Sequence, residues 1–473
     1  MAELEDISLH CSKCRAEFRV AEWDRRFLDQ LSVPLPRLCP QCRRLRRLVH
    51  VNQVHLFRRT CGATKKQIIS NYPPESVCPV YDQAYWWSDA FDAVAYGRDY
   101  DFSRSFFSQF QELSSAVPRP ALFTDYTRDE NSAYTNYAGL NKNCYMIFDS
   151  DENWDCYYSS GMNGSRSSMD CYRVQNVELC YEAVDCTNCY SCLFAANCED
   201  CFDCAFVQNC IGCKKCLFCS NLRQKEYYYR NQRVSPAEFS RLWAEFASFP
   251  RVERQRQQFG EWKRKFPQKF MRGYKNENVT GNYLVNCKNA VECYDSMNLW
   301  DCKYCTQVFM SLRDSLDCHE CGESQLLYEC SHTGYNAYNV MFTSRCLKQL
   351  TNLFYCLYCF NGCADLFGCV GLKRRQYCIL NKHYSKEDYL ALRGKIIEQM
   401  QAQGEWGEYF PAELSAFPYN LTVAEEYYPL SREQALGSGY AWYEEPPRDY
   451  RAQTCVIADT IMEIPESITS ETL

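Results

Sequence analysis

Small or apolar residues recur at every third position through the middle of the chain, and this pattern predicts its main fold. In the frame of Cys156, cysteine alternates with Val, Ala, Ser and Met at three, six, nine and twelve residues further on. Because cysteine exchanges there with core-filling residues, we interpret these positions as a shared interior. Five cysteines lie fifteen residues apart, and Asp precedes the first four of them: Cys156, Cys171, Cys186, Cys201 and Cys216. The sequence therefore predicts a repeat of fifteen residues.

A unit of this length cannot enclose a core alone, so its copies must stack on one another. The regular solution is a β-solenoid with coils about 4.8 Å apart, whose equivalent residues form ladders through the interior. Spacing by threes does not match the alternation of a long strand, so each side of a coil must be short. An α-solenoid is disfavoured, because it would need longer repeats with a period of about 3.6 residues.

The cysteines of this region can be explained in three ways. We favour packing as a core ladder of free thiols, since Val and Ser stand at equivalent positions of neighbouring coils. Metal binding is the first alternative, because CxxC recurs, although a stacked column of thiolates would need several soft cations. Disulfides are the second, because adjacent rungs fall within the Cα range that a bridge requires. The predicted thiol ladder comprises Cys156, Cys171, Cys186, Cys189, Cys201, Cys204, Cys216 and Cys219.

A second Cys-rich region runs from Cys287 to Cys378, with spacings of fifteen and sixteen residues. The end of each region is followed by Ser-x-x-acid, at Ser235 and at Ser385, which is the start signal of a capped helix. We expect helices near 236–247 and 386–402 that cover the open ends of two solenoid lobes. Another helix is expected with Ser103 as its N-cap, since Phe106, Phe107, Phe110 and Leu113 recur at helical spacing as a docking face for a neighbouring domain.

Two CxxC pairs near the N-terminus give the most specific chemical signal. Each pair places two thiolates on one tight turn, and two such turns complete the four-ligand shell that Zn²⁺ prefers. A shell of four cysteines leaves no open position, so we expect a structural zinc ion in a zinc ribbon or treble clef. The predicted metal ligands are Cys11, Cys14, Cys39 and Cys42. Cys61 and Cys78, with His50 and His55 nearby, match no such spacing, and we expect them to pack without metal.

Basic residues gather directly after the second pair, in a stretch with no acid between Leu31 and Pro74. Guanidinium groups there could neutralise phosphates, and nearby aromatic rings could stack on bases. The alternatives are a solvated basic face, or one that docks on the acidic remainder of the chain. The candidate nucleic-acid-binding residues are Arg37, Arg43, Arg44, Arg46, Arg47, Arg58, Arg59, Lys65 and Lys66.

These patterns together predict a mainly β protein with capping helices. An N-terminal zinc ribbon or treble clef precedes two Cys-rich β-solenoid lobes of about 15 residues per coil, each closed by an α-helix. We expect six segments: a zinc domain with its basic flank (1–80), an aromatic connector with a helix (81–130), the first lobe (131–234), a helical cap and linker (235–275), the second lobe (276–384), and a helical cap with an aromatic, Pro-containing wrap (385–473).

Composition narrows the class and the expected location. The chain has 473 residues, 46% of them apolar and 15% aromatic, which argues against extended disorder. The acidic start MAELEDISLHC does not resemble a signal peptide, and no apolar run approaches the length of a membrane span. We therefore expect a cytoplasmic protein with no membrane partner, in which the 34 cysteines stay reduced.

The motifs resemble those of a known group of proteins over nearly the whole chain. PLPRLCPQCR, WWSD, YGRDYDFS, the Cys-rich coils and SAFPYNLTVAEEYYPL occur in this order. In this combination the chain resembles an uncharacterised zinc-ribbon, Cys-rich repeat family of uncultivated small-genome bacteria. The resemblance supports zinc and implies no activity. Members usually continue into a second zinc ribbon, which suggests that this chain is cut short at Leu473.

These observations favour a non-enzymatic zinc-binding scaffold whose partner is RNA or another protein; they do not specify its oligomeric state. The alternative is a thiol-rich metal-binding or redox-buffer protein, which would hold far more than one metal ion. An enzyme is disfavoured, because the sequence contains no phosphate-binding glycine loop, nucleophile elbow or HExxH. Cys318-His319-Glu320-Cys321 joins reactive residue types, but adjacency in sequence is not catalytic geometry.

Overall fold

The computed structural model describes residues 6–175, 177–447, 454–465 and 467–468. It divides into two compact units. One comprises Met1–Ala121 with Lys269–Tyr443, and the other comprises Leu122–Gln268 with Glu444–Leu473. Among the described residues, no helix has the length and apolar character needed to cross a membrane.

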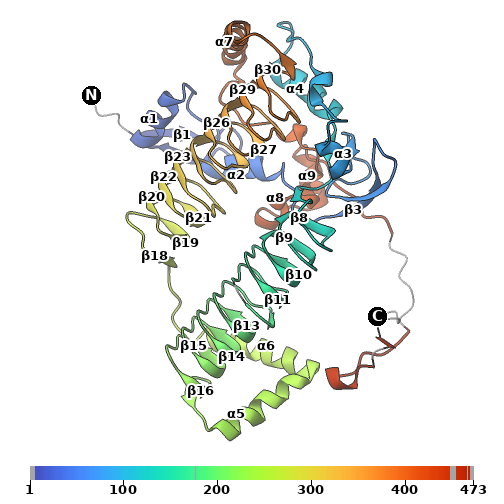
Figure 1. Cartoon of the computed structure of the whole chain (residues 1–473). Coiled ribbons are helices and arrows are strands. Elements are labelled where there is room, and N and C mark those ends of the chain that lie inside the picture. The colour runs from blue at the N-terminus through green and yellow to red at the C-terminus, as the bar shows by residue number, and fades with distance from the viewer. Residues whose placement is uncertain (1–5, 176, 448–453, 466, 469–473) are drawn as a thin grey trace. The chain divides into compact units, whose positions relative to one another are not determined.

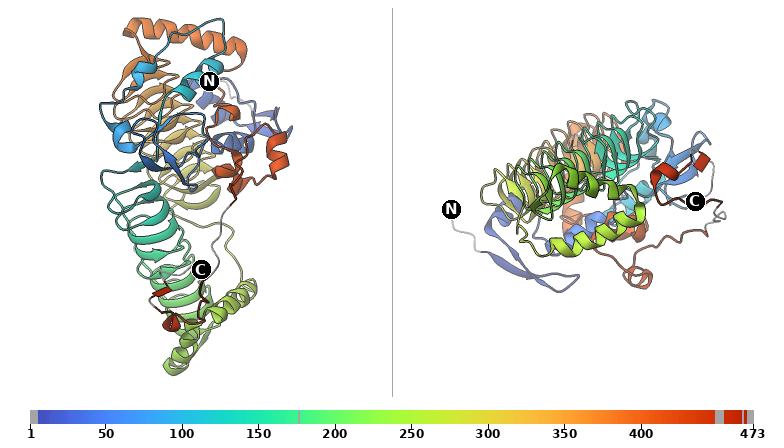
Figure 2. Two further views of the ribbon diagram at one scale, coloured as in Figure 1. Left: turned by 90° about the vertical axis from the view of Figure 1, so that its right-hand side faces the viewer. Right: turned by 90° about the horizontal axis from the view of Figure 1, so that it is seen from below.

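The second unit contains the first solenoid lobe, a stack of short parallel strands (Figure 1). Neighbouring strands pair in sequence order from β7 to β16, and β17 returns antiparallel to β16. The left view of Figure 2 shows the coils as a regular stack. The strands are β7 (Thr124–Asp125), β8 (Tyr134–Gly139), β9 (Tyr145–Asp151), β10 (Trp154–Ser160), β11 (Arg166–Met169), β12 (Cys180–Tyr181), β13 (Tyr190–Ala196), β14 (Phe202–Gln208), β15 (Lys214–Ser220), β16 (Glu226–Tyr229) and β17 (Gln232–Arg233).

The β-solenoid fold is confirmed, but the predicted coil of about 15 residues is wrong. Cys192 pairs with Cys204, and Lys214 pairs with Glu226, so the coils from β9 to β16 have twelve residues. The first coil is longer, since Thr124 of β7 pairs with Ala138 of β8, fourteen residues on. The reason lies in the backbone: every third residue, for example Asp155 and Tyr158, has a positive φ and turns the chain just before an inward-facing residue. Four such three-residue sides make one coil. Fifteen residues are therefore one coil plus one side.

Because the coil has twelve residues, the cysteines of the predicted thiol ladder belong to different stacked columns than predicted. All eight of its cysteines are buried, as expected of a core. They do not stack in two ladders, because residues fifteen apart lie on successive walls of the coil. The stacked positions are instead twelve apart, and the Cys-rich columns are Cys180, Cys192, Cys204 and Cys216; Cys186, Cys198 and Cys210; and Cys189, Cys201 and Cys213.

The second lobe belongs to the first unit and has coils of three lengths. Gly273 pairs with Leu284, eleven residues on, and Gly281 pairs with Cys293, twelve residues on. Leu299 pairs with Leu312, thirteen residues on. A thirteen-residue coil plus one side accounts for the spacings of sixteen in the sequence. The strands are β18 (Gly273–Tyr274), β19 (Gly281–Val285), β20 (Lys288–Val291), β21 (Cys293–Met297), β22 (Leu299–Lys303), β23 (Leu312–Leu316), β24 (Ser324–Tyr328), β25 (Ser331–Gly334), β26 (Tyr338–Met341), β27 (Ser344–Leu347), β28 (Thr351–Phe354), β29 (Ala364–Phe367), β30 (Gln376–Ile379) and β31 (Lys382–His383).

Each lobe is followed by the expected capped helix. The Ser235 hydroxyl accepts a hydrogen bond from the Glu238 N–H at 3.2 Å and begins α5 (Pro236–Trp243), which contacts β16. The Ser385 hydroxyl accepts one from the Asp388 N–H at 3.0 Å and begins α7 (Lys386–Gln403), which contacts β30. The linker helix α6 (Phe249–Lys263) packs along β14 and β15 of the first lobe.

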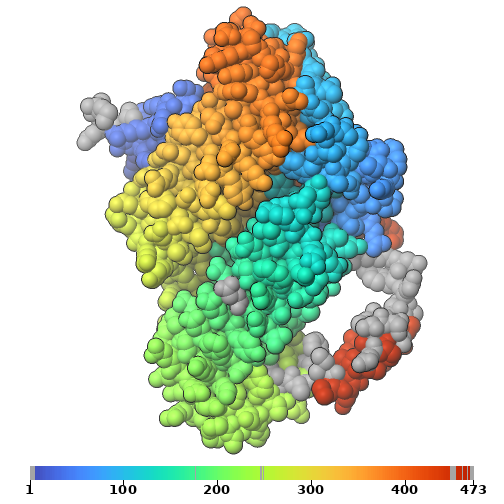
Figure 3. Space-filling model, viewed as in Figure 1, coloured from blue at the N-terminus to red at the C-terminus, as the bar shows by residue number. Residues whose placement is uncertain are grey.

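The remaining elements of the first unit surround the second lobe, and Figure 3 shows the blue N-terminal segments against the yellow and orange coils. The aromatic helix α4 (Phe106–Ala116) docks through Phe106 on Tyr355 and Phe367, as its spacing predicted. Its N-cap is Ser105, not Ser103, because only Ser105 lies at the helix start and bonds the Ser108 N–H. Trp406, in the C-terminal wrap, contacts the rings of Phe354 and Phe367.

The other helices and strands of this unit are short. They are β1 (Ile7–His10), β2 (Glu17–Val20), α1 (Glu22–Gln30), α2 (Pro40–Leu48), β3 (Phe57–Thr60), β4 (Gln67–Ser70), β5 (Val80–Tyr81), α3 (Gln83–Trp87), β6 (Arg119–Pro120), α8 (Val423–Tyr427) and α9 (Arg432–Gly437). Short 3₁₀ turns of this unit lie at Ala93–Tyr96, Ala412–Leu414 and Tyr419–Leu421, and the other unit has two, at Ala244–Ala247 and Ile461–Glu463.

Candidate metal centre

The four predicted ligands come from two different local structures. Cys11 and Cys14 lie in the tight turn between β1 and β2. Cys39 is the N-cap of α2, where Pro40 favours the first helical position, and Cys42 follows in the first turn. A hairpin turn and a helix start thus face one another, which is the treble-clef alternative of the prediction.

The sulfur atoms have the geometry of a metal site. The four Sγ atoms all lie within 4.8 Å of one another, and those of Cys14 and Cys39 are 3.7 Å apart. A tetrahedral shell with Zn–S bonds of about 2.3 Å has sulfur–sulfur separations of about 3.8 Å. Three of the cysteines are buried and Cys14 is exposed. The donor set therefore fits a metal ion held by four thiolates.

The protein tunes these thiols unequally. Burial works to raise the pKa of Cys11, but hydrogen bonds from backbone N–H groups, including that of Cys14, outweigh it and lower this pKa to about 6. Burial raises the pKa of Cys39 and of Cys42 above the usual thiol range. Four thiolates this close together repel one another, so a divalent cation is what allows all four to ionise.

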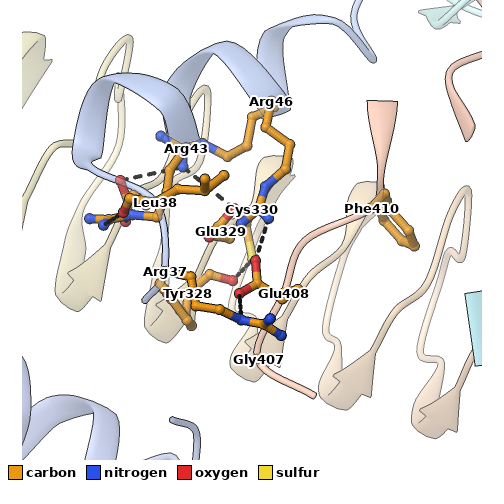
Figure 4. Close-up of polar contacts among 12 residues, drawn as sticks. Arg37, Leu38, Arg43, Arg46, Tyr328, Glu329, Cys330, Gly407, Glu408 and Phe410 are labelled. Carbon is orange, nitrogen blue, oxygen red and sulfur yellow. Dashed lines mark hydrogen bonds and ion pairs between the residues drawn. The ribbon is translucent and has the colours of Figure 1, made fainter. Parts of the chain in front are cut away.

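The helix that begins at this quartet delivers three arginines to two buried carboxylates. Figure 4 shows two of these arginines, Arg43 and Arg46, with Glu329. Arg43 Nε donates to Asp317 Oδ2 at 2.6 Å, and both side chains are almost fully buried. Arg46 Nη2 donates to Glu329 Oε1 at 2.7 Å, and its Nη1 pairs with Glu408 from the C-terminal wrap. Arg47 Nη1 lies 3.3 Å from Asp317 Oδ1 and 3.8 Å from Glu329 Oε2. The result is a buried ion cluster of α2 and the second lobe.

The charges of this cluster sustain one another. Burial alone would lower the pKa of Arg43, but the carboxylates of Asp317 and Glu329 outweigh it and raise that pKa. Burial raises the pKa of Glu329, while Arg46 and Arg47 pull it down. Removing one member would leave a buried charge without its partner, which is far more costly than the pair itself is stabilising.

The nine predicted nucleic-acid-binding residues therefore fall into different settings. Arg43, Arg46 and Arg47 are withdrawn into the protein, so for them the docking alternative holds. Arg37 is exposed and pairs with Glu408, Arg44 lies over the Tyr427 ring at 4.4 Å, and Arg59 donates to the Pro73 carbonyl at 2.9 Å. The exposed remainder lies on the β3–β4 hairpin and its turn: Arg58, Lys65 and Lys66.

Sequence reasoning missed Asp317 and Glu329 as functional residues. A signal for them was present, because each directly precedes a cysteine, as Asp155 and Asp170 do in the first lobe. Nothing in that repeat distinguishes a buried acid from an exposed one. The one indication of a buried acidic partner was the positive charge of the arginine-rich segment, which contains no acid.

The alternative second metal site near Cys61 and Cys78 does not assemble. Among the described residues, only the N-terminal quartet brings three or more potential ligand atoms together. His50 is buried, which lowers its pKa to about 4, and its Nε2 lies 3.3 Å from the Phe410 carbonyl oxygen. Cys318 and His319 are likewise buried positions of the second lobe.

The thiols inside the first lobe are placed as hydrogen-bond donors. Cys192 Sγ lies 3.5 Å from the Tyr190 carbonyl oxygen and 3.4 Å from that of Cys201, and the same pattern recurs at Cys201 and Cys204. A protonated thiol can donate to these oxygens, whereas a thiolate would be repelled by them. This environment favours packing of neutral thiols over metal ligation.

No protein-family model and no curated protein matched the chain in comparisons of its sequence. The resemblance drawn from its motifs stays a prediction.

Proposed function

We propose that this protein is a non-enzymatic scaffold in which the cysteine quartet holds one structural zinc ion. Four soft ligands at tetrahedral separations favour Zn²⁺ over harder cations such as Mg²⁺ or Ca²⁺. All four positions are filled by protein, so the ion would have no site for a substrate or a reactive water. Its contribution would be to fold the segment that binds it.

The observation that carries this proposal is the buried ion cluster next to the quartet. Cys39 and Cys42 define where α2 begins, and Arg43, Arg46 and Arg47 follow within its next turns. A metal ion at the quartet would hold this start in register, so that the guanidinium groups meet Asp317 and Glu329. In this proposal the zinc ion holds the N-terminal segment in its contact with the second lobe.

Elemental analysis combined with thiol titration of the intact protein tests the proposal. We expect about one zinc ion per chain, its loss in Cys39→Ser, and a lower thermal midpoint after chelation. Cys201→Ala is the matched control, because its thiol is buried in the first lobe and should leave the zinc content unchanged. Several ions per chain that decrease in Cys201→Ala would instead establish the thiol-rich metal store. A chain that binds no metal ion would refute both.

RNA contact is a second candidate, which we propose for the β3–β4 hairpin. Its support is the exposure of Arg58, Lys65 and Lys66 on one short element, where cations can contact phosphates. We expect RNA binding at low salt that weakens when all three become Ala. Lys269→Ala with Lys386→Ala and Lys395→Ala removes three exposed lysines outside the hairpin and is the control for charge alone. Equal binding by both variants would reject the hairpin as an interface, and binding of a protein instead would establish the other partner class.

A further inference from the structure

Residues 57–70 repeat the hairpin of residues 7–20 at an offset of fifty. In each, a four-residue strand leads into a cysteine, a tight turn and a second four-residue strand. The Cys11 N–H donates to the Ala16 carbonyl at 2.9 Å, and the Cys61 N–H donates to the Lys66 carbonyl at 2.8 Å. The left-handed residue of the turn is Arg15 (φ 65°) in one and Lys65 (φ 61°) in the other.

The turn around the sulfur atom is also the same. The Cys14 N–H donates to Cys11 Sγ at 3.5 Å, and the Thr64 N–H donates to Cys61 Sγ at 3.3 Å. Thr64 therefore stands where the first hairpin has its second metal ligand. Cys61, like Cys11, is completely buried.

The likeness extends to the segment that follows each hairpin. The Ser12 N–H donates to the Arg37 carbonyl at 3.0 Å, and the Gly62 N–H donates to the Val80 carbonyl at 2.9 Å. Two residues beyond each acceptor comes a helix N-cap, Cys39 of α2 in the first case and Asp82 of α3 in the second. Asp82 thus corresponds to Cys39, and Tyr85 corresponds to Cys42.

We propose that residues 57–87 are a second copy of the metal-binding module, in which hydrogen bonds have replaced the metal ion. Three of the four ligand positions carry Thr64, Asp82 and Tyr85. The contact that the ion would provide between hairpin and helix start is made by the Asp82 N–H, which donates to Cys61 Sγ at 3.1 Å. Asp82 Oδ1 accepts from the Ala84 N–H at 3.1 Å and the Tyr85 N–H at 3.3 Å, so the helix start is held without metal.

The inference makes this copy a latent site for a soft divalent cation. It rests on the proposed function, because the first module supplies the template for the ligand positions. Its consequence for the native protein is that only one of two equivalent modules needs metal. The metal-free copy should stay folded under chelation, while the first module does not.

Restoring the three ligands tests the proposal directly. We expect Thr64→Cys/Asp82→Cys/Tyr85→Cys to bind one more Co²⁺ per chain than the native protein, with the absorption of tetrahedral cobalt thiolate. Adding Cys61→Ser should remove that extra ion. A folded triple variant that binds no additional Co²⁺ would overturn the proposal, as would a native protein that holds a second ion and loses it in Cys61→Ser.

Two further variants keep the test decisive. Thr64→Cys/Asp82→Cys retains the Tyr85 ring and should still gain a weaker Co²⁺ site with three thiolates, so it serves if the triple variant does not fold. Its failure to gain any site while folded also counts against the proposal. Placing the triple variant in a Cys11→Ser/Cys14→Ser background separates the two modules. One Co²⁺ there supports the second copy even if the native quartet binds nothing.

Discussion

The two solenoid lobes both place acids directly before inward-facing cysteines, but the surroundings of these acids differ. In the first lobe the acids before the inward cysteines, such as Asp155 and Asp170, are exposed. In the second lobe Asp317 and Glu329 occupy the same place in the repeat and are completely buried under α2. The coil fixes only that such a residue points outward. Whether it meets water or a guanidinium group depends on the element that covers the coil.

The interiors differ in a related way. From β9 to β16 the first lobe keeps twelve-residue coils filled largely with Cys, Ala and Val. The second lobe mixes coils of eleven, twelve and thirteen residues and adds larger side chains such as Leu312 and Leu327. A regular lumen suits small, interchangeable thiols. The irregular lobe is the one onto which the metal module, α4 and the C-terminal wrap pack.

The largest effect should come from breaking the buried ion cluster. We expect Glu329→Ala to destabilise the first unit by about 3–5 kcal/mol, because Arg46 and Arg47 lose a buried partner. Asp170→Ala, the exposed acid of the same frame, should change stability by less than about 0.5 kcal/mol. Thermal and urea unfolding of both variants measure the difference. Equal shifts would mean that the two lobes do not differ in the way their acids are used.

A third buried acid of the second lobe should give a pH-dependent effect. Burial raises the pKa of Glu320 to about 8, although Arg345 and the Gln53 amide oppose it, and Glu426 adds to it. His332 Nδ1 lies 2.5 Å and His319 Nε2 3.7 Å from its carboxyl oxygens. Between the ordinary value of 4.5 and about 8, the folded protein holds a proton that the unfolded chain releases. Stability is therefore present below this window and is lost as pH rises through it.

Glu320→Gln removes that titration, so its stability should fall less steeply than that of the native protein across this window. Inside the window the native protein should lose up to about 1.4 kcal/mol more per pH unit than the variant. Unfolding free energies measured at several pH values test it, with Glu152→Gln, an exposed glutamate of the first lobe, as control. Parallel native and Glu320→Gln profiles would show that Glu320 does not carry the effect.

The sequence contains enough information for the solenoid, the quartet and the capped helices, because each rests on local spacing. The coil length does not follow from local spacing in the same way. The fifteen-residue period was the more visible one, because the Asp-Cys pairs recur after one twelve-residue coil plus one three-residue side. The burial of Asp317 and Glu329 lay beyond reach for another reason: it depends on a helix almost three hundred residues earlier in the chain. The repeat at Cys61 escaped notice because only one ligand remains.

Deleting one coil of the first lobe tests the corrected period. In the native protein Phe194, Phe206 and Phe218 stack at intervals of twelve residues. Removing residues 198–209 joins Asn197 to Cys210 and deletes Phe206, but it leaves Phe218 stacked directly on Phe194. Phe259 of α6 can then still pack against the rings of Phe194 and Phe218. Removing residues 198–212 turns the chain by one extra side and takes Phe218 off that column. In the native protein Phe259 contacts Phe206 and Phe218, and Arg256 of α6 pairs with Glu182.

We expect the fifteen-residue deletion to be less stable than the twelve-residue one by about 2 kcal/mol, the burial lost with one aromatic side chain. Thermal unfolding followed by circular dichroism compares them. If the fifteen-residue deletion were the more stable, a twelve-residue coil would be untenable.

The smallest effect should be the same in both lobes. Ser235→Ala and Ser385→Ala each remove the hydroxyl that caps the closing helix, and each should cost about 1 kcal/mol. Asp at either position can accept the same N–H and should restore most of the loss. Because the lobes differ in lumen and covering but end in the same capped helix, equal costs are expected. Urea unfolding measures both costs. The Ser385 hydroxyl also donates to Asp388 Oδ2 at 2.8 Å, but this exposed contact does not predict a much larger cost at Ser385. A much larger cost there would mean that α7 stabilises the second lobe by more than closing its end.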